Sequence, residues 1–454
     1  MIAPARAAAF ETLLAVENRR ADLPHALARA RTGLHDERDR SLAGEIATGT
    51  LRWQAAFDHV ISGISSRAIT RLDPEVRVIL RLTIFQLLHL DRVPASAAVN
   101  DAVSMTRRAG KTSAAAMVNA VLRRISRERD RLPLPGRPAG GGSDREAMLD
   151  YLSITLSHPR WLAGRWLDRY GFDKAEAWAR FNNLPAPLIL RANTLKIARN
   201  ALSTQLRAHG VETTATRFAP DGLVVTAGNP LLTPLAGQGL FVVQEEASQL
   251  VSLMAPATAG QRILDACASP GGKTIALASL QNDSGTIVAA DVRGRRIELL
   301  QRTIDTSGAR SIRIVQADAA KGPFAPSSFD GALLDVPCSG LGTVRRDPDL
   351  KWRREESELA QLSTAQRAML REVASVIRPG GWLVYATCSS EPEENEAVVD
   401  AFVSDSGFEL ARPKDLPDSV RPLIDTRGYL QTQPPRDGME AFFAAAMVRT
   451  KRLR

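Results

Sequence analysis

The first third of the chain repeats apolar residues at the spacing of amphipathic helices. Apolar side chains fall on one helical face between Leu42 and Ile61 and again between Val76 and Leu88, and similar stripes follow Pro94 and Ser113. One turn of α-helix holds about 3.6 residues, so this spacing predicts successive helices that each bury one face. We therefore predict a small all-α bundle over residues 1–132.

The pattern then changes at a stretch rich in proline and glycine, PLPGRPAGGGSD. Such a composition is typical of a flexible linker, which we place at residues 133–146. Beyond it, helical segments such as WLAGRWLDRY mix with short extended segments such as LILRAN and GLFVVQ. This mixture predicts a small α/β subdomain over residues 147–255.

From residue 256 onward, short apolar stretches alternate strictly with helical segments. The stretches that we expect to be strands are RILDAC, TIVAADV, IRIVQAD, GALLDVP and WLVYATC. Apolar strands separated by helices predict a parallel, doubly wound sheet over residues 256–454. We expect the last apolar stretch, GMEAFFAAAMVR, to be an edge strand of that sheet.

Composition excludes some classes of protein. The chain has 454 residues, 44% of them apolar and 24% charged, which is typical of folded globular proteins and excludes general disorder. No apolar run approaches the roughly 18 residues of a membrane span, and Glu11 and Glu17 interrupt the start where a signal peptide would be apolar. We expect a cytoplasmic protein that makes no contact with a membrane.

The net charge of +9 is confined to the first half of the chain. Residues 1–250 hold 33 of the 59 Lys and Arg against 24 of the 50 Asp and Glu, which leaves 26 of each for residues 251–454. A local excess of basic residues favours a polyanionic partner such as nucleic acid. A solvated basic surface without a partner explains the charge equally well.

Three cysteines are present, Cys267, Cys338 and Cys388, and no two of them form a CxxC pair. A zinc site or a disulfide framework is therefore not expected, and we predict no metal. The spacing instead predicts free thiols in a reducing compartment.

Chemically useful residues stand where the predicted strands end. These residues are Asp265, Asp291, Asp318, Asp335 and Cys388. Ligands of doubly wound sheets bind at the carboxyl ends of the strands, so we expect these side chains to line one site. Between the first strand and its helix lies ACASPGGKT, in which two glycines allow a tight turn and a close approach to a ligand.

Two nucleotide-binding interpretations fit this loop. It resembles the phosphate-binding loop of ATPases with Cys267 at the first glycine position, and ALLDVP is similar to the second strand motif of those enzymes. However, the missing glycine and Pro270 disturb a phosphate cradle, and an acidic Asp291 after the second strand suits the hydroxyl groups of a ribose. A P-loop ATPase stays an alternative, as does a non-catalytic RNA-binding factor.

Together, the segments LDACASPGGKT, LLDVPCSGLGTVRRDPDLKW and VYATCSSEPEENEAVV closely resemble the RNA 5-methylcytosine methyltransferases that use S-adenosyl-L-methionine. The helical segments DRVPASAAVNDAVSMTRR and MVNAVLRRI resemble the NusB-like RNA-binding domain of the bacterial RsmB-type (Sun/Fmu) branch, which modifies small-subunit (16S) ribosomal RNA. The resemblance implies a multidomain fold: a NusB-like bundle, a small RNA-binding α/β subdomain and a Rossmann-like class I methyltransferase domain. Ser269 and Glu245 depart mildly from the family pattern.

The resemblance also implies where S-adenosyl-L-methionine binds. Asp291 would hold the ribose, Asp318 would lie near the adenine and Asp335 near the methyl donor. The loop residues implied are Cys267, Ala268, Ser269, Pro270, Gly271, Gly272 and Lys273. Lys273 either lies beside a thiol and lowers its pKa or is an ordinary surface lysine at the start of a helix.

The reaction itself calls for a thiol. Carbon 5 of cytosine attacks a methyl group only after a nucleophile has added to carbon 6, and a thiolate is suited to that addition. Asp335 could hold the base and offset the charge that develops. Spacing does not decide between Cys338 and Cys388. The resemblance implies that Cys388, in the TCS motif, attacks, and that Cys338, in the PCS motif, helps to release the product.

The expected partner is RNA. A base attacked from its face must leave its stack, so we expect a single-stranded, looped or remodelled site in naked or partly assembled ribosomal RNA, and a monomeric enzyme. The segment VRRDPDLKWRREE fits either RNA contact or a solvated helix start. Its relevant residues are Arg345, Arg346, Lys351, Trp352, Arg353 and Arg354.

Overall fold

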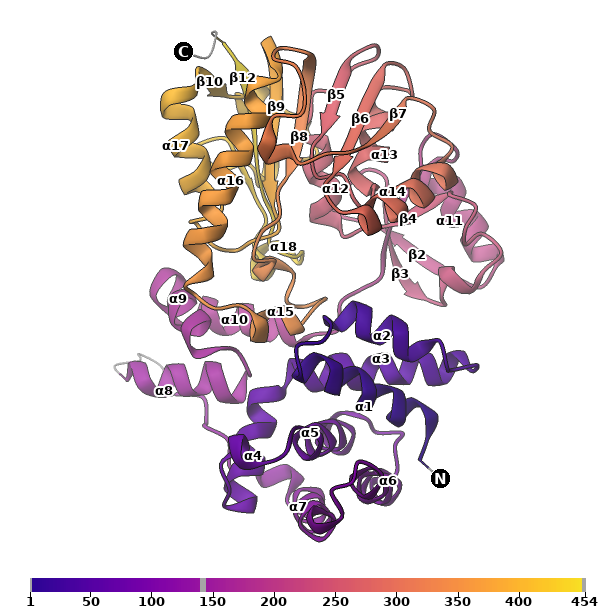
Figure 1. Cartoon of the computed structure of the whole chain (residues 1–454), viewed down its shortest axis with the longest axis vertical. Helices are drawn as coiled ribbons and strands as arrows, with labels where there is room; N and C mark the ends of the chain where they lie inside the picture. Colours follow the sequence, from indigo (N-terminus) through magenta and orange to yellow (C-terminus); the bar gives the residue numbers. More distant parts are fainter. Residues whose placement is uncertain (1, 139–143, 451–454) are drawn as a thin grey trace. The chain divides into compact units, whose positions relative to one another are not determined.

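The computed structural model describes residues 2–138 and 144–450 (Figure 1). The chain forms two compact units, each built from two stretches of sequence. Unit 1 comprises Met1–Pro185 and Val344–Arg354, and unit 2 comprises Ala186–Thr343 and Glu355–Arg454.

Unit 1 is all-helical, which confirms the predicted bundle. Its first helices are α1 (Pro4–Glu17), α2 (Leu23–Arg31), α3 (Glu37–Arg52), α4 (Gln54–Ser65), α5 (Pro74–His89), α6 (Ala95–Arg108) and α7 (Ala115–Arg127). The apolar stripes of the sequence form its core, in which Ile46, Phe57 and Ile79 are almost fully buried. Asp22 and Asp36 cap α2 and α3 by accepting backbone hydrogen bonds.

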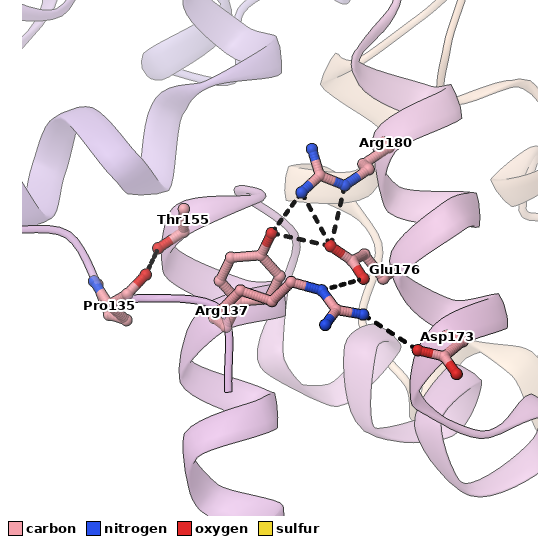
Figure 2. Close-up of polar contacts among 7 residues, drawn as sticks. Pro135, Arg137, Thr155, Asp173, Glu176 and Arg180 are labelled. Carbon is pink, nitrogen blue, oxygen red and sulfur yellow. Dashed lines mark hydrogen bonds and ion pairs between the residues drawn. The ribbon is translucent and has the colours of Figure 1, made fainter. Parts of the chain in front are cut away.

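Unit 1 continues past the predicted linker, of which residues 139–143 lie outside the described part. Three further helices follow: α8 (Arg145–Asp150), α9 (Arg160–Tyr170) and α10 (Phe172–Asn183). Figure 2 shows how the first residues of the predicted linker are held: Thr155 donates to the carbonyl oxygen of Pro135 at 2.6 Å, and Arg137 pairs with Glu176 at 2.8 Å. These contacts explain why unit 1 extends to Pro185, whereas the sequence predicted a boundary at the linker.

The segment Val344–Arg354, which contains α15 (Asp349–Arg353), completes unit 1. Lys351 is buried, and its side-chain nitrogen Nζ donates to the carbonyl oxygens of Arg52 at 3.0 Å and Ser157 at 2.5 Å. The indole N–H of Trp352 donates to the carbonyl of Leu51 at 2.6 Å. The last carbonyls of α3 thus find partners some 300 positions away. Burial lowers the pKa of Lys351 well below its usual range, and the expectation of an RNA-contacting or solvated residue is wrong for this lysine.

Unit 2 begins with a small antiparallel sheet in the order β2-β3-β1-β4. Its strands are β1 (Ile189–Ala192), β2 (Glu212–Ala215), β3 (Gly222–Ala227) and β4 (Phe241–Val243), accompanied by α11 (Arg199–Ala208) and α12 (Glu246–Leu253). Leu190, Leu202 and Leu206 form the core between the sheet and α11.

The second sheet of unit 2 has eight strands in the order β10-β12-β9-β8-β5-β6-β7, with β11 beside β12. The strands are β5 (Arg262–Asp265), β6 (Thr286–Asp291), β7 (Ile312–Gln316), β8 (Phe329–Asp335), β9 (Ile377–Thr387), β10 (Phe408–Leu410), β11 (Tyr429–Gln431) and β12 (Phe443–Arg449). The helices are α13 (Gly272–Leu280), α14 (Gly294–Ser307), α16 (Glu358–Ser375), α17 (Glu396–Ser406) and the short α18 (Pro434–Asp437).

The strands β5 to β9 pair in parallel, as predicted, but β12 pairs antiparallel with β9, so the sheet is mixed. The expectation that the last strand forms an edge is wrong, because β12 lies between β9 and β10. Its central residues Ala444 to Met447 are all buried, which suits an interior position.

Strand order reverses at β5, whose neighbours are β6 on one side and β8 on the other. Such a reversal leaves a crevice at the carboxyl ends of the strands. The carboxyl ends of β5, β6, β8 and β9 carry Asp265, Asp291, Asp335 and Cys388, and Asp318 follows β7. In the described part of the chain, no helix combines the length and apolar character needed to cross a membrane.

Candidate active site

The loop after β5 is shaped by glycine. Gly271 has φ +105°, a backbone conformation that residues with a side chain rarely adopt, and a Cβ there would lie 3.0 Å from a methyl of Leu300. The loop is tied to the strand end by Thr274, whose hydroxyl donates to Asp265 at 2.6 Å. Burial raises the pKa of Asp265 to about 7. This fully buried carboxyl group therefore supports the loop.

Asp291, at the end of β6, joins the same loop from the neighbouring strand. Its carboxylate accepts hydrogen bonds from the backbone N–H of Ser269 at 3.4 Å and of Arg293 at 3.3 Å. The guanidinium of Arg296 lies 3.8 Å away. The structure thus places Asp291 beside residues 267–273. A nucleoside ligand held by this loop would have its ribose within reach of the Asp291 carboxylate.

Asp318 follows β7 and has a local partner. It caps a helical turn by accepting from the backbone N–H of Ala320 at 3.0 Å, and it pairs with Lys321 at 3.4 Å. A role toward an adenine remains a prediction for this residue.

The start of α13 also faces a hydrogen-bond acceptor that has no partner among the described residues. A Cβ at Gly272 would lie 3.6 Å from the side-chain amide of Gln244, whose Oε1 is buried without a hydrogen-bond partner among the described residues. An acceptor of this kind suits the ammonium group of an amino-acid moiety. The glycine loop, Asp291 and Gln244 together fit S-adenosyl-L-methionine.

Lys273 and Asp335 form an ion pair of 2.7 Å between the glycine loop and the end of β8. The lysine side chain is only 14% exposed, so the interpretation as a surface lysine is wrong. Burial alone would lower the pKa of Lys273, but the Asp335 carboxylate raises it above its usual value, and the charge of a Cys388 thiolate adds to this effect. The pair is therefore an ammonium and a carboxylate beside the thiols.

Cys338 and Cys388, which spacing alone could not place, lie together. Their sulfur atoms are 3.3 Å apart. The parallel register of β8 and β9 pairs Asp335 with Ala386, and beyond the strands the N–H of Gly342 donates to the carbonyl of Cys388 at 2.9 Å. The two loops that carry the thiols are thus joined by main-chain bonds.

The thiols differ in their environments. The hydrogen bond with Cys388, together with burial, raises the pKa of Cys338 well above its usual range. Burial and then the Asp265 carboxylate raise the pKa of Cys267 in the same way. The pKa values of both Cys338 and Cys267 are therefore raised, which makes these two thiols poor nucleophiles at neutral pH.

Glu394 did not stand out in the sequence, yet it is fully buried and contacts both loops that carry the thiols. It accepts hydrogen bonds from Ser339 and Ser389, the residues that follow Cys338 and Cys388. The repeated Cys-Ser pair was the available signal, because it places matching hydroxyl groups beside both thiols.

Three family models match the chain. The model "16S rRNA methyltransferase RsmB/F" covers residues 251–448, "NusB family" covers residues 3–127, and the ferredoxin-like domain model "Methyltr_RsmF/B-like" covers residues 158–231.

Similar proteins span nearly the full length. The "Probable ribosomal RNA small subunit methyltransferase B" of Bacillus subtilis is 33% identical, and the match covers 90% of this chain and 91% of the relative. The "Ribosomal RNA small subunit methyltransferase B" of Pseudomonas putida is also 33% identical, over 88% of each chain. Among solved structures, that of PH0851 has a TM-score of 0.80 with 25% identity over 99% of both chains. A methyltransferase homologue of Pyrococcus horikoshii has a TM-score of 0.58 with 27% identity, over 67% of this chain and 100% of that one.

Proposed function

The chain belongs to the 16S rRNA methyltransferase RsmB/F family, and on that premise we propose that it methylates carbon 5 of a cytosine in small-subunit ribosomal RNA, with Cys388 as nucleophile. Membership makes the protein an S-adenosyl-L-methionine-dependent methyltransferase and excludes both the P-loop ATPase and the non-catalytic RNA-binding factor. The observation that carries the proposal is the pair of thiols 3.3 Å apart, beside an ion pair at the point where strand order reverses.

The proposed reaction begins with bond formation between the Cys388 sulfur and carbon 6 of the cytosine. The addition makes carbon 5 nucleophilic, so that carbon 5 forms the new bond to the methyl group while the bond from that methyl group to the sulfonium sulfur breaks and its electron pair stays on the sulfur. Loss of the carbon 5 proton and cleavage of the sulfur–carbon 6 bond then restore the aromatic ring and free Cys388. Cys338, which lies 3.3 Å from Cys388, is positioned to assist this release.

Asp335 and Lys273 orient the base and balance its charge in this proposal. Addition of sulfur to carbon 6 pushes negative charge toward ring nitrogen 3, where the Asp335–Lys273 pair offers fixed polar groups. Bound S-adenosyl-L-methionine supplies an electrophilic methyl group on a sulfonium. Residues Cys267 to Lys273 and Asp291 would hold that cofactor, with Asp318 toward its adenine.

Replacing Asp291 with alanine should weaken binding of S-adenosyl-L-methionine by about 1 to 3 kcal/mol, because the carboxylate loses charge-assisted hydrogen bonds. Isothermal titration calorimetry on the folded variant measures the change. Asp283→Ala is the matched control, since Asp283 also accepts backbone hydrogen bonds, from Arg310 and Ser311. Equal affinity in the Asp291 variant and the wild type would remove Asp291 from the cofactor site.

We also propose that unit 1 binds the RNA, in the cytoplasm and with the enzyme acting as a monomer. A groove of about 620 Å³ between α1 and α2 is lined mostly by small residues, with Arg20, Arg29 and His25 and one acidic residue, Glu11. Basic side chains along a groove suit a phosphate backbone. Naked or partly assembled ribosomal RNA is the expected form of the substrate, because the target base must leave its stack.

The double substitution Arg20→Ala and Arg29→Ala in the full chain should reduce RNA affinity and flatten its salt dependence. Each lost phosphate contact removes roughly 0.7 to 0.9 units of the slope of log affinity against log salt. Fluorescence anisotropy over a salt series provides the slope. Arg412→Ala is the control, because Arg412 is exposed in unit 2 and pairs with Asp415. An unchanged slope in the double variant would mean that the groove does not contact RNA.

The proposed activity is tested with purified protein, small-subunit ribosomal RNA and S-adenosyl-L-methionine. Bisulfite sequencing should reveal one cytosine that resists conversion only when both protein and cofactor are present. Methylation at another atom or another base, detected by mass spectrometry of the digested RNA, would contradict the proposal.

A further inference from the structure

One buried carboxylate joins the two loops that carry the thiols. Glu394 Oε1 accepts from the backbone N–H of Ser339 at 2.8 Å, and Oε2 accepts from the Ser339 hydroxyl at 2.5 Å. The Ser389 hydroxyl donates to the same Oε2 at 2.5 Å. Because Ser339 follows Cys338 and Ser389 follows Cys388, the carboxylate contacts the residue next to each thiol.

The hydrogen bonds of Glu394 require an acceptor at both oxygens. Besides the serines, Gln366 donates to Oε1 at 2.9 Å, so each oxygen accepts two hydrogen bonds. A carboxylate offers about four lone-pair sites, and here donors face all of them. An amide at this position would point its NH₂ group at two donors, and Glu394→Gln therefore breaks one side of the arrangement with almost no change in volume.

Neighbouring polar residues contact the loop that carries Cys388. Asn395 donates to the carbonyl of Ser389 at 3.0 Å and accepts from Thr387 at 2.5 Å, both on the Cys388 side. Glu391, which is also buried, accepts from Ser390 at 2.8 Å. Glu391 thus provides a second buried glutamate in the same segment, whereas it is Glu394 that contacts both Ser339 and Ser389.

We propose that Glu394 is a positioning residue that fixes the separation of Cys338 and Cys388 for the steps that use both thiols. The inference rests on the proposed function, in which Cys388 attacks and Cys338 assists release. Reactions between positioned groups lose on the order of 100-fold in rate for a displacement of about 1 Å. Glu394 acts through the serines and touches neither substrate nor cofactor in this role.

The experiment compares Glu394→Gln with Glu391→Gln in the full chain by two measurements. The first is steady-state methylation, from which kcat and KM for RNA are separated. The second is the rate at which Cys338 and Cys388 form a disulfide with diamide, whose azo bond takes up the two electrons and two protons that the thiols lose. Peptide mass spectrometry identifies the linked cysteines, and this measurement needs neither RNA nor methyl transfer.

We expect Glu394→Gln to lower kcat by about 100-fold and disulfide formation by about tenfold, while KM for RNA stays within roughly threefold. Glu391→Gln should stay within roughly threefold of the wild type in all three quantities. If Glu394→Gln does not fold, Ser339→Ala and Ser389→Ala replace it, because each removes one of the hydroxyl groups that donate to Glu394. Both variants should slow methylation and disulfide formation. Ser339→Thr retains the hydroxyl and should restore both rates.

A folded Glu394→Gln variant with wild-type kcat and a wild-type rate of disulfide formation would overturn the proposal. So would equal losses in Glu394→Gln and Glu391→Gln, which would indicate general destabilisation of the segment. If the wild-type protein fails to methylate cytosine but Glu394→Gln still slows disulfide formation, the proposed function is wrong and the positioning role stands.

Discussion

Cys388→Ala should abolish methyl transfer, lowering the rate by at least about 10³-fold, and no covalent RNA adduct should form. Without the thiol no bond to carbon 6 arises, and carbon 5 stays unreactive. Cys338→Ala should behave differently, because the nucleophile is intact and release is impaired. Its turnover should fall by about 10²- to 10⁴-fold while enzyme and RNA stay covalently joined after methylation.

Denaturing gels with labelled RNA separate these outcomes, since a covalent adduct migrates as a slow band. Calorimetry with S-adenosyl-L-methionine shows that each variant retains its fold and its cofactor site. A band in Cys388→Ala that is missing in Cys338→Ala would reverse the two roles. Full methylation by both variants would exclude covalent catalysis by these thiols.

The second large effect is expected for Asp335→Asn. The substitution removes the carboxylate from its 2.7 Å pair with Lys273 and leaves an ammonium with little access to water. The free energy of unfolding should fall by about 2 kcal/mol, and kcat should fall by about 10²- to 10³-fold through loss of the fixed charges at the base.

The double variant Asp335→Asn with Lys273→Met separates stability from catalysis. Removing both charges should restore much of the free energy of unfolding, measured by urea denaturation, because no unpaired ion remains. Its kcat should stay low. A double variant that regains kcat would show that Asp335 serves only to neutralise Lys273 and has no part in orienting the base.

The strands and helices that depend on local sequence pattern were predicted well. Alternating apolar stretches located the strands β5 to β9, and the residues at their ends, such as Asp291 and Asp335, followed from the general position of ligands in such sheets. The helical bundle was predicted equally well, because amphipathic helices show a regular apolar stripe in the sequence. Cys338 and Cys388 lie together because they stand in the loops that follow the neighbouring parallel strands β8 and β9.

Contacts between residues that lie far apart in the sequence could not be predicted from local sequence pattern. Lys351 stands among charged residues and was expected either to contact RNA or to be solvated, yet its acceptors lie 299 and 194 positions away in the chain. Glu394 belongs to the acidic run EPEEN, which has the composition of an exposed turn, and only the fold brings Ser339 to it from 55 positions upstream. The place of β12 inside the sheet likewise depends on pairing, which an alanine-rich strand does not reveal.

Because unit 1 is built from two separate stretches of sequence, its parts are synthesised at different times. Residues up to Pro185 leave the ribosome first, but Lys351 and Trp352, which bind the last carbonyls of α3, belong to the later stretch Val344–Arg354. At about 5 to 20 residues per second, the intervening chain takes roughly 10 to 30 s to synthesise. During that interval the nascent bundle has an open end at Leu51 and Arg52, and it becomes complete only when four of the eight strands of the large sheet, β5 to β8, have been synthesised.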